Sequence, residues 1–317
     1  MLPLVDVRNI KKHFKTPHGM LHAVDGVDLS IQSGKTLGVV GESGCGKSTL
    51  GRLVVNLIEA TDGEVYFNNE LISSKNKKDM KALRKEMQMI FQDPFSSLNP
   101  RMSVSELIAD PLHVHERAIG RQVIDAKVEK LMESVGLSLK FKDSYPHELD
   151  GGRRQRIGIA RALALNPRFI VCDEPVSALD VSIQAQILNL LKDFQRDLGL
   201  TYLFITHDLS VVRFISDEIM VMYLGKVMER CSAQELCQAY LHPYTKALFS
   251  AILVPTIHNK RERIILKGEL SSPVNPKPGC RFAPRCPDAF TTCFIEEPKL
   301  AEFKPNHFIA CHKFKKK

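Results

Sequence analysis

One stretch of the chain combines glycines, a lysine and a serine at a spacing that suits phosphate chemistry. It fits the pattern G-x-x-x-x-G-K-S/T, and its residues, with the threonine that follows, are Gly41, Glu42, Ser43, Gly44, Cys45, Gly46, Lys47, Ser48 and Thr49. Glycines let backbone N–H groups approach phosphate oxygens without a Cβ in the way. Lys47 then supplies a positive charge to the β and γ phosphates of a nucleotide, and the Ser48 hydroxyl can ligate Mg²⁺. The spacing therefore predicts a nucleotide site rather than a chance glycine-rich turn.

Two adjacent carboxylates follow an apolar run in the middle of the chain. Residues 169–172 predict a buried strand, and Asp173 and Glu174 come at its end. In open α/β sheets, ligands bind at the carboxyl ends of the strands. Asp173 is therefore expected to hold Mg²⁺, directly or through water, and Glu174 to polarise the attacking water. An apolar run before Asp-Glu is common by itself, but beside a phosphate loop it predicts nucleotide hydrolysis.

These residues need a sheet whose strand ends carry them. A buried strand is predicted over 36–40, and a helix is expected from about Lys47 to Leu57. The other expected elements are short strands and turns over 3–35 with breaks at Gly19, Gly26 and Gly34, helices over most of 100–150, an amphipathic helix over 183–198 and a strand over 202–206. Strands that alternate with helices imply an α/β fold with a largely parallel sheet.

Length and composition limit the class of protein. The 317 residues suffice for one large domain with an appendage. The chain contains no apolar run long enough to cross a bilayer, and its start does not resemble a signal peptide. If the protein works at a membrane, we expect it to dock onto the membrane rather than span it. The net charge of +8 comes from scattered basic residues, which indicates a solvated surface rather than a nucleic-acid site.

Four further motifs follow in order along the chain. They are Phe91-Gln92-Asp93-Pro94, Asp150-Gly151-Gly152-Arg153, Ser177-Ala178-Leu179-Asp180 and Ile205-Thr206-His207-Asp208. With the phosphate loop and the acidic pair, this series resembles an ABC ATPase cassette over about 4–255. The resemblance implies a P-loop NTPase core with an antiparallel β portion, a helical subdomain at about 94–160, and hydrolysis of ATP with Mg²⁺.

The resemblance also implies roles for single residues. Gln92 would sense the metal and couple to a membrane subunit, and His207 would contact the γ-phosphate. Asp180 would lie in the loop that crosses a dimer interface. Phe14 matches the aromatic residue that stacks on adenine, with a plain core phenylalanine as the less favoured alternative.

Finer matches resemble one branch of this family, the oligopeptide and dipeptide importers. They are residues 23–27, 38–51 and 242–248 and the cysteine-rich tail, while Arg52 and residues 99–101 favour the F-type subunit. The branch implies a head-to-tail heterodimer with a D-type ATPase at the cytoplasmic face of the membrane. Two permeases and an extracytoplasmic peptide-binding protein complete the machine. Two alternatives are the same machine with nickel or another small solute as cargo, and a soluble regulatory ABC protein that acts on nucleic acid or ribosomes.

The glycine pair departs from the family pattern, Leu/Phe-Ser-Gly-Gly-Gln. Asp150 replaces the serine and Arg153 the glutamine, whereas the serine of the family, with Gly151 and Gly152, meets the γ-phosphate of ATP on the other subunit. Like charges at about 4 Å repel by roughly 1 kcal/mol in water and about 4 kcal/mol at an effective dielectric of 20. Arg153 and Arg154 could compensate. We therefore expect two unequal ATP sites, the alternative being a tolerated substitution.

Four cysteines crowd the end of the chain, where prolines exclude a long helix. Residues 256–317 are therefore expected to form a small module after an ATPase domain over 1–255. Cys280, Cys286, Cys293 and Cys311 lack the paired spacing of common zinc folds, and thiolates suit either zinc or iron–sulphur centres. Resemblance to peptide-importer ATPases implies a 4Fe–4S cluster. Reduced cysteines packed as small apolar groups are the simpler alternative. His307 and His312 are nearby alternative ligands, although the sequence favours exposed tail histidines.

Overall fold

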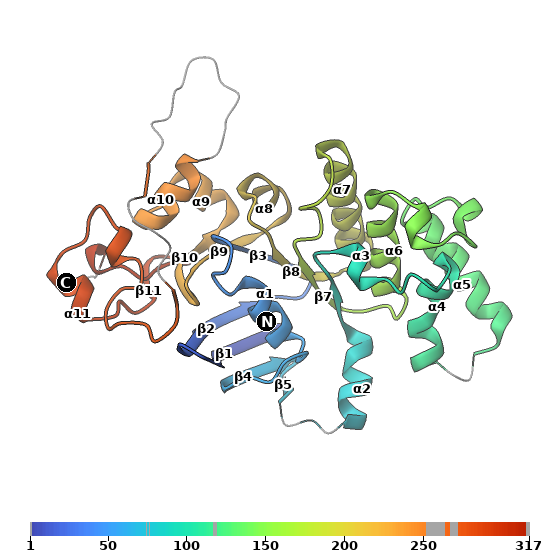
Figure 1. The fold of residues 1–317 in the computed structure, drawn as a ribbon, viewed down its shortest axis with the longest axis horizontal. Helices are drawn as coiled ribbons and strands as arrows, with labels where there is room; N and C mark the ends of the chain where they lie inside the picture. Colours follow the sequence, from blue (N-terminus) through green and yellow to red (C-terminus); the bar gives the residue numbers. More distant parts are fainter. Residues whose placement is uncertain are drawn as a thin grey trace, which may run out of the picture. The chain divides into compact units, whose positions relative to one another are not determined.

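The computed structural model of the chain describes residues 2–73, 75, 77–116, 119–251, 264–266 and 272–314. These residues form two compact units (Figure 1). The first unit holds residues 1–32, 36–73 and 204–317, and the second holds residues 33–35 and 74–203. The expected border between 255 and 256 lies outside the described residues.

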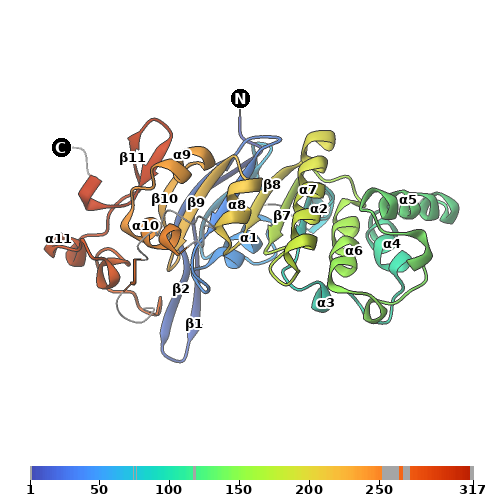
Figure 2. The same cartoon turned by 90° about the horizontal axis from the view of Figure 1, so that it is seen from above.

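An antiparallel sheet forms one part of the first unit. Its strands are β1 (Val5–Thr16), β2 (Gly19–Ile31), β4 (Asp62–Phe67) and β5 (Glu70–Leu71), in the order β2-β1-β4-β5. The chain breaks as expected at Gly19, where β2 begins, and at Gly34, in the turn before residue 36. The blue hairpin of β1 and β2 is long (Figure 2) and Gly26 lies inside β2, so the expectation of short strands with a break at Gly26 was wrong. The register shifts between Val7 and Ile10, and Gly26 adopts a φ of +73°, so the paired strands bend through an irregularity instead of ending.

A second group of strands in the first unit carries the phosphate loop. The strand β3 (Thr36–Val40), buried throughout as predicted, pairs in parallel with β9 (Glu218–Tyr223). The strand β9 pairs antiparallel with β10 (Lys226–Ser232), β10 with β12 (His307–Ile309), and β12 with β11 (Ala301–Lys304). The helices of this unit are α1 (Lys47–Val54), α8 (Leu209–Ile215), α9 (Ala233–Gln238), α10 (Pro243–Ser250) and α11 (Thr291–Ile295).

The second unit is mostly helical. Its helices are α2 (Lys77–Glu86), α3 (Pro94–Ser97), α4 (Val104–His115), α5 (Arg121–Ser134), α6 (Gly151–Leu163) and α7 (Val181–Leu198), with short 3-10 turns at Leu139–Phe141 and Pro146–Glu148. The strands β6 (Met87–Ile90) and β7 (Phe169–Asp173) pair in parallel. The predicted helix over 183–198 is confirmed as α7, which Gly199 ends with a φ of +67°. The strand β8 (Thr201–Ile205) crosses the border between the units.

The C-terminal residues pack onto the first unit instead of standing apart. The prolines leave only α11 and the short turns Ala283–Arg285 and His312–Phe314 as helical structure over 272–314. Phe282 is fully buried in a cluster with Tyr223 and Tyr244. Val274 forms a bridge with Leu21 of β2. The cysteine-rich tail therefore shares its core with the strands that follow the phosphate loop.

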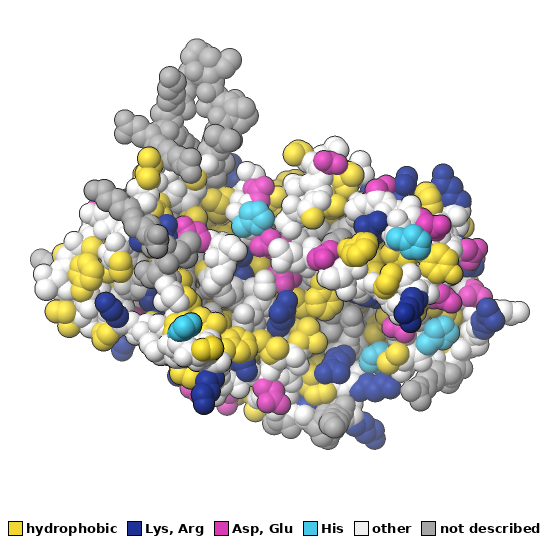
Figure 3. All heavy atoms as spheres, viewed as in Figure 1, with side chains coloured by type: hydrophobic (Ala, Val, Ile, Leu, Met, Phe, Trp, Pro, Cys, Tyr) yellow, Lys and Arg dark blue, Asp and Glu magenta, His cyan; other side chains and the backbone are white. Residues whose placement is uncertain are grey.

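The charged side chains are spread over the surface, as predicted from the scattered basic residues. Lys and Arg side chains lie at many separate places on the face in Figure 3, with Asp and Glu among them. Within the described part of the chain, none of the helices has the length and apolar character needed to cross a membrane.

Candidate nucleotide-binding site

The phosphate loop lies between β3 and α1, as its pattern requires. A Cβ on Gly41 would lie 2.1 Å from the carbonyl oxygen of Met222, and one on Gly46 would lie 2.1 Å from that of Ala23. Gly46 also caps α1 with a φ of +104°. The neighbouring backbone thus lies so close to Gly41 and Gly46 that any larger residue at either position would push that backbone away.

Lys47 is held inside the loop. Its side chain is buried, and its Nζ donates to the carbonyl oxygens of Gly41 and Glu42 at 2.8 and 3.2 Å. The backbone N–H of Cys45 also donates to the Glu42 carbonyl, at 3.2 Å. The backbone of Glu42 therefore fixes both the turn of the loop and the charge that phosphate would meet. Ser48 follows Lys47 in the first turn of α1.

In the second unit, the structure brings together two of the predicted residues. The amide Nε2 of Gln92, which follows β6, donates to Oε2 of Glu174 at 3.1 Å. Asp173 is buried at the end of β7, and Glu174 directly after it adopts the left-handed φ of +47°, which is uncommon outside glycine. Strained backbone of this kind concentrates at functional sites, because only a rigid surrounding can maintain it.

The departing signature residues form a local ion pair. Asp150 caps α6, accepting the backbone N–H of Arg153 at 2.8 Å, and its other oxygen lies 2.8 Å from the Arg153 guanidinium. Arg154 instead donates to the Pro146 carbonyl and lies over the ring of Phe95. Within this chain, the charge of Asp150 is thus paired with that of Arg153, and both side chains are about half-exposed.

Three further predicted residues lie at the surface or at a helix start. Phe14 of β1 is 37% exposed, with the Lys12 ammonium 5.2 Å from its ring centroid, so the alternative of a core phenylalanine was wrong. His207 is exposed between β8 and α8. Asp180 caps α7, where its carbonyl accepts the N–H of Gln184.

The four tail cysteines share one region. The thiol of Cys280 interacts electrostatically with Cys293 and Cys311, and Cys286 does so with the same two. Burial raises the pKa of Cys280 to about 11 and also raises that of Cys286 and Cys311. Three thiolates on one zinc ion would lie about 3.8 Å apart, given Zn–S bonds of about 2.3 Å. Among the described residues, no three of these sulphurs lie within 4.8 Å of one another, so they do not form a ready-made site for a single metal ion.

Two histidine clusters were not predicted. His307 is fully buried and bonds to Glu229 at 2.8 Å and Glu235 at 2.9 Å, and the Glu229 bond raises its pKa. It is therefore not an exposed tail residue, and both of its ring nitrogens bond to carboxylates. Both of its partners lie more than seventy residues away along the chain, so no local pattern could have indicated them.

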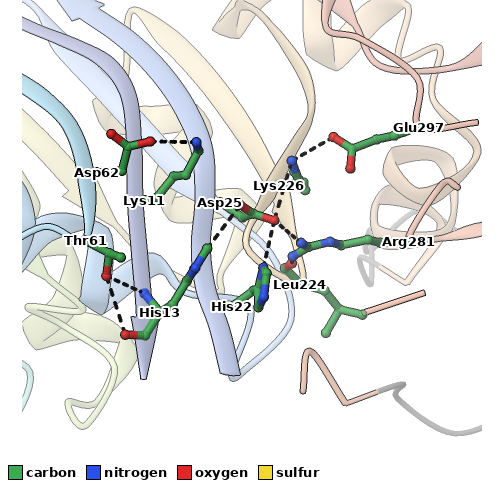
Figure 4. Close-up of polar contacts among 10 residues, drawn as sticks. All are labelled: Lys11, His13, His22, Asp25, Thr61, Asp62, Leu224, Lys226, Arg281 and Glu297. Carbon is green, nitrogen blue, oxygen red and sulfur yellow. Dashed lines mark hydrogen bonds and ion pairs between the residues drawn. The ribbon is translucent and has the colours of Figure 1, made fainter. Parts of the chain in front are cut away.

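Asp25 of β2 forms the centre of the other cluster (Figure 4). His13 and His22 each lie 3.2 Å from its carboxylate oxygens, and Lys226 and Arg281 form ion pairs with it. His13, His22 and Asp25 each offer one ligand atom, and these three atoms lie within 4.8 Å of one another, as they would around a metal ion. Two permanent cations already neutralise the carboxylate, however, so this cluster joins the tail to β2.

Comparisons with known proteins place these features in a family. A model of ABC transporters matches residues 24–177, and a model of the C-terminal region of oligopeptide/dipeptide transporters matches residues 228–293. The oligopeptide transport ATP-binding proteins AppF and OppF of Bacillus subtilis are 51% and 49% identical to this chain. The matches cover 98% and 97% of this chain, and 97% and 96% of those proteins.

Solved structures agree on the fold. A dimeric structure of the ATP-binding cassette MJ0796 in a post-hydrolysis state, bound to ADP and Pi, is 31% identical with a TM-score of 0.67. It covers 72% of this chain and 98% of its own. The cassette cbiO1 from Clostridium perfringens is 26% identical with a TM-score of 0.66, covering 75% of this chain and 92% of its own.

The fold and the motifs define an ATPase of the ABC transporter class, with a P-loop α/β core and an antiparallel β subdomain, as predicted. Within that class, the chain belongs to the family of oligopeptide transport ATP-binding proteins.

Proposed function

We propose that this chain binds and hydrolyses ATP to power the import of oligopeptides through a membrane ABC transporter. The observation that carries the proposal is the phosphate loop with Lys47 held on its own carbonyls, in a chain that matches peptide-transport ATPases over nearly its whole length. The direct test is peptide uptake driven by ATP in vesicles that contain the complete transporter, because this assay measures ATP hydrolysis and peptide import together.

The roles of single residues follow from their chemistry. Lys47 and the loop N–H groups bind the phosphates, and Phe14 offers an exposed ring for adenine. Ser48 and Asp173 would hold Mg²⁺, which supplies charge neutralisation at the phosphates when bound. Glu174 polarises the attacking water, and its bond from Gln92 gives that glutamine a means to orient it. By their motifs, His207 would contact the γ-phosphate and Asp180 would lie in the loop that crosses the dimer interface.

The proposed partners are a D-type ATPase subunit in a head-to-tail heterodimer and two permease subunits, with an extracytoplasmic peptide-binding protein that delivers the cargo. This assembly would place the chain at the cytoplasmic face of the membrane as a peripheral subunit. Support comes from the match of residues 228–293 to the C-terminal region of oligopeptide/dipeptide transporters. Co-purification of the chain with its membrane subunits tests the assembly, whereas capture of ribosomes or nucleic acid instead would favour a regulatory ABC protein.

The two ATP sites of the heterodimer are proposed to be unequal. Asp150 and Arg153 would face ATP bound by the partner, and their ion pair leaves a carboxylate where the family places a neutral serine. We expect Lys47→Ala in this chain to lower the ATPase rate of the complex about tenfold more than the matching change in the partner, as a repulsion of about 1 to 4 kcal/mol implies. ATPase assays on the two single variants and on Asp150→Ser make the comparison. Equal losses would remove the asymmetry.

The tail cysteines are proposed to hold an iron–sulphur cluster of the 4Fe–4S type. Protein purified without oxygen should then contain about four iron atoms and as much sulphide per chain, with visible absorption that Cys293→Ser removes. Cys231→Ser is the matched control, since this buried cysteine lies outside the tail. One zinc atom per chain and no iron would instead support the zinc alternative, and neither metal would leave the cysteines as packing residues.

Nickel or another small solute is the second candidate cargo, because permeases and binding proteins rather than the ATPase select what is transported. Ligand screening on the co-purified binding protein distinguishes peptides from metal ions.

A further inference from the structure

The residues after the ATPase motifs reach back to the phosphate loop, and they converge on Glu42. This residue is the second position of the loop, and its carbonyl holds Lys47. The guanidinium of Arg285, from the cysteine-rich tail, binds its carboxylate in a forked arrangement with N···O distances of 2.7 and 3.2 Å. Tyr244, from the start of α10, accepts the Glu42 backbone N–H on its hydroxyl at 2.9 Å. Both the side chain and the backbone of Glu42 are thus bound by residues two hundred or more positions away.

Both partners are themselves fixed. The ring of Tyr244 is fully buried and packs against Tyr223 and Phe282 at centroid distances of 4.7 and 5.3 Å. Arg285 follows Phe282 in the same turn, donates to the Tyr223 hydroxyl at 3.3 Å, and has a side chain only 9% exposed. Side chains with this much packing have few other rotamers available, so they can hold the loop in one geometry.

The start of α10 explains how Tyr244 is aimed. His242 caps the helix by accepting the backbone N–H of Tyr244 on Nδ1 at 3.0 Å. The His242 backbone N–H in turn donates to the buried carboxylate of Glu229, at 3.0 Å. Burial lowers the pKa of His242 to about 4, so the ring is neutral and Nδ1 remains an acceptor at neutral pH. The His-Pro-Tyr sequence, which the nucleotide chemistry leaves without a role, therefore aims a hydroxyl at the phosphate loop.

Besides holding Glu42 in place, Arg285 neutralises the negative charge of the Glu42 carboxylate. Glu42 places a carboxylate in a loop that must receive the phosphates of ATP, and like charges repel more strongly where water is partly excluded. A forked guanidinium neutralises this carboxylate and holds it away from other partners. The side chain of Glu42 is 21% exposed, so water alone screens it incompletely.

We propose that Arg285 and Tyr244 are positioning residues that hold the phosphate loop through Glu42, so that the C-terminal region sets the affinity of the loop for ATP. The inference rests on the proposed ATP site at Lys47. It makes the cysteine-rich tail part of the nucleotide site, independent of whether its cysteines hold a cluster.

The test measures binding of a fluorescent ATP analogue with Mg²⁺ to the full-length chain. Arg285→Ala should weaken binding about tenfold and Tyr244→Phe about threefold, which is what a hydrogen bond to a charged group and a neutral one contribute. Arg285→Lys should recover part of the loss. The double variant Glu42→Gln with Arg285→Ala should recover most of it, because no unpaired carboxylate remains. In the assembled complex, the KM for ATP should rise while kcat changes little.

Matched controls separate this effect from a general loss of stability. Arg230→Ala breaks another ion pair of the first unit, with Glu218, and Tyr202→Phe removes another buried hydroxyl, which donates to Leu191. Both controls should keep wild-type affinity. Variants of Arg285 and Tyr244 that fold with the melting temperature of the wild type and bind ATP equally well would overturn the inference, as would a double variant no better than Arg285→Ala. Lys47→Ala tests the ATP site itself and should lose affinity whatever Arg285 and Tyr244 do. If the wild-type chain did not bind the ATP analogue, the proposed function would be defeated, and not only this inference.

Discussion

Replacement of Lys47 by alanine is expected to weaken binding of MgATP by this chain about a hundredfold, the loss expected when a buried cation that serves phosphate is removed. The ammonium of Lys47 is held on the carbonyls of Gly41 and Glu42, so it is oriented before any ligand arrives and loses little freedom on binding. Removal of the side chain leaves the loop N–H groups and the start of α1 as the remaining contacts for the phosphates.

Equilibrium titration of the full-length variant with a fluorescent ATP analogue measures this loss. Lys127→Ala is the matched control, because this lysine lies on α5, far along the chain from the loop, and pairs with Glu116 at 2.8 Å. The control should bind as the wild type does. If Lys47→Ala also bound with unchanged affinity while remaining folded, the phosphate loop would have to be assigned another role.

Replacement of Glu174 by glutamine is expected to have the opposite profile, with ATP binding retained and hydrolysis at the ATP site that contains Glu174 lowered about a thousandfold, so that only the weaker second site of the complex still turns over. Removal of a positioned general base costs roughly 10² to 10⁴ in rate. The amide is nearly the same size as the carboxylate and can still bond to Gln92, so the loop geometry after β7 should survive. The strained φ of Glu174 should survive as well, because the backbone around it is unchanged.

ATPase rates and nucleotide affinity must be measured on the same preparation to separate the two effects. Glu218→Gln serves as the control, since this exposed carboxylate pairs with Arg230 away from the acidic motif. Retention of full ATPase activity in the Glu174 variant would mean that another group activates the water. Loss of binding together with activity would mean that Glu174 acts in assembly of the site.

Local spacing was enough to predict the elements that carry the chemistry. The phosphate loop, the buried strands before and after it and the helix α7 all follow from patterns within about twenty residues. The signature substitution at Asp150 was also visible in the sequence, and its pairing with Arg153 three residues later is within the reach of one helical turn.

Partners distant along the chain could not be predicted. Glu42 and Arg285 are 243 residues apart and Asp25 and Arg281 are 256 apart, so neither periodicity nor motif spacing indicates that they meet. The prolines and cysteines of the tail predicted an appended module, but no local pattern indicated the burial of Phe282 or the pairing of β12 with β10, which join its described residues to the first unit. Such contacts depend on tertiary packing, which overrides local composition.

Uptake of a radiolabelled oligopeptide into vesicles that contain the complete transporter tests the central claim most directly. The prediction is uptake that requires ATP with the wild-type chain and falls to background when this chain carries Glu174→Gln, although the complex still assembles and binds ATP. Uptake at the wild-type rate with Glu174→Gln would contradict the claim that ATP hydrolysis by this chain powers the import of peptides.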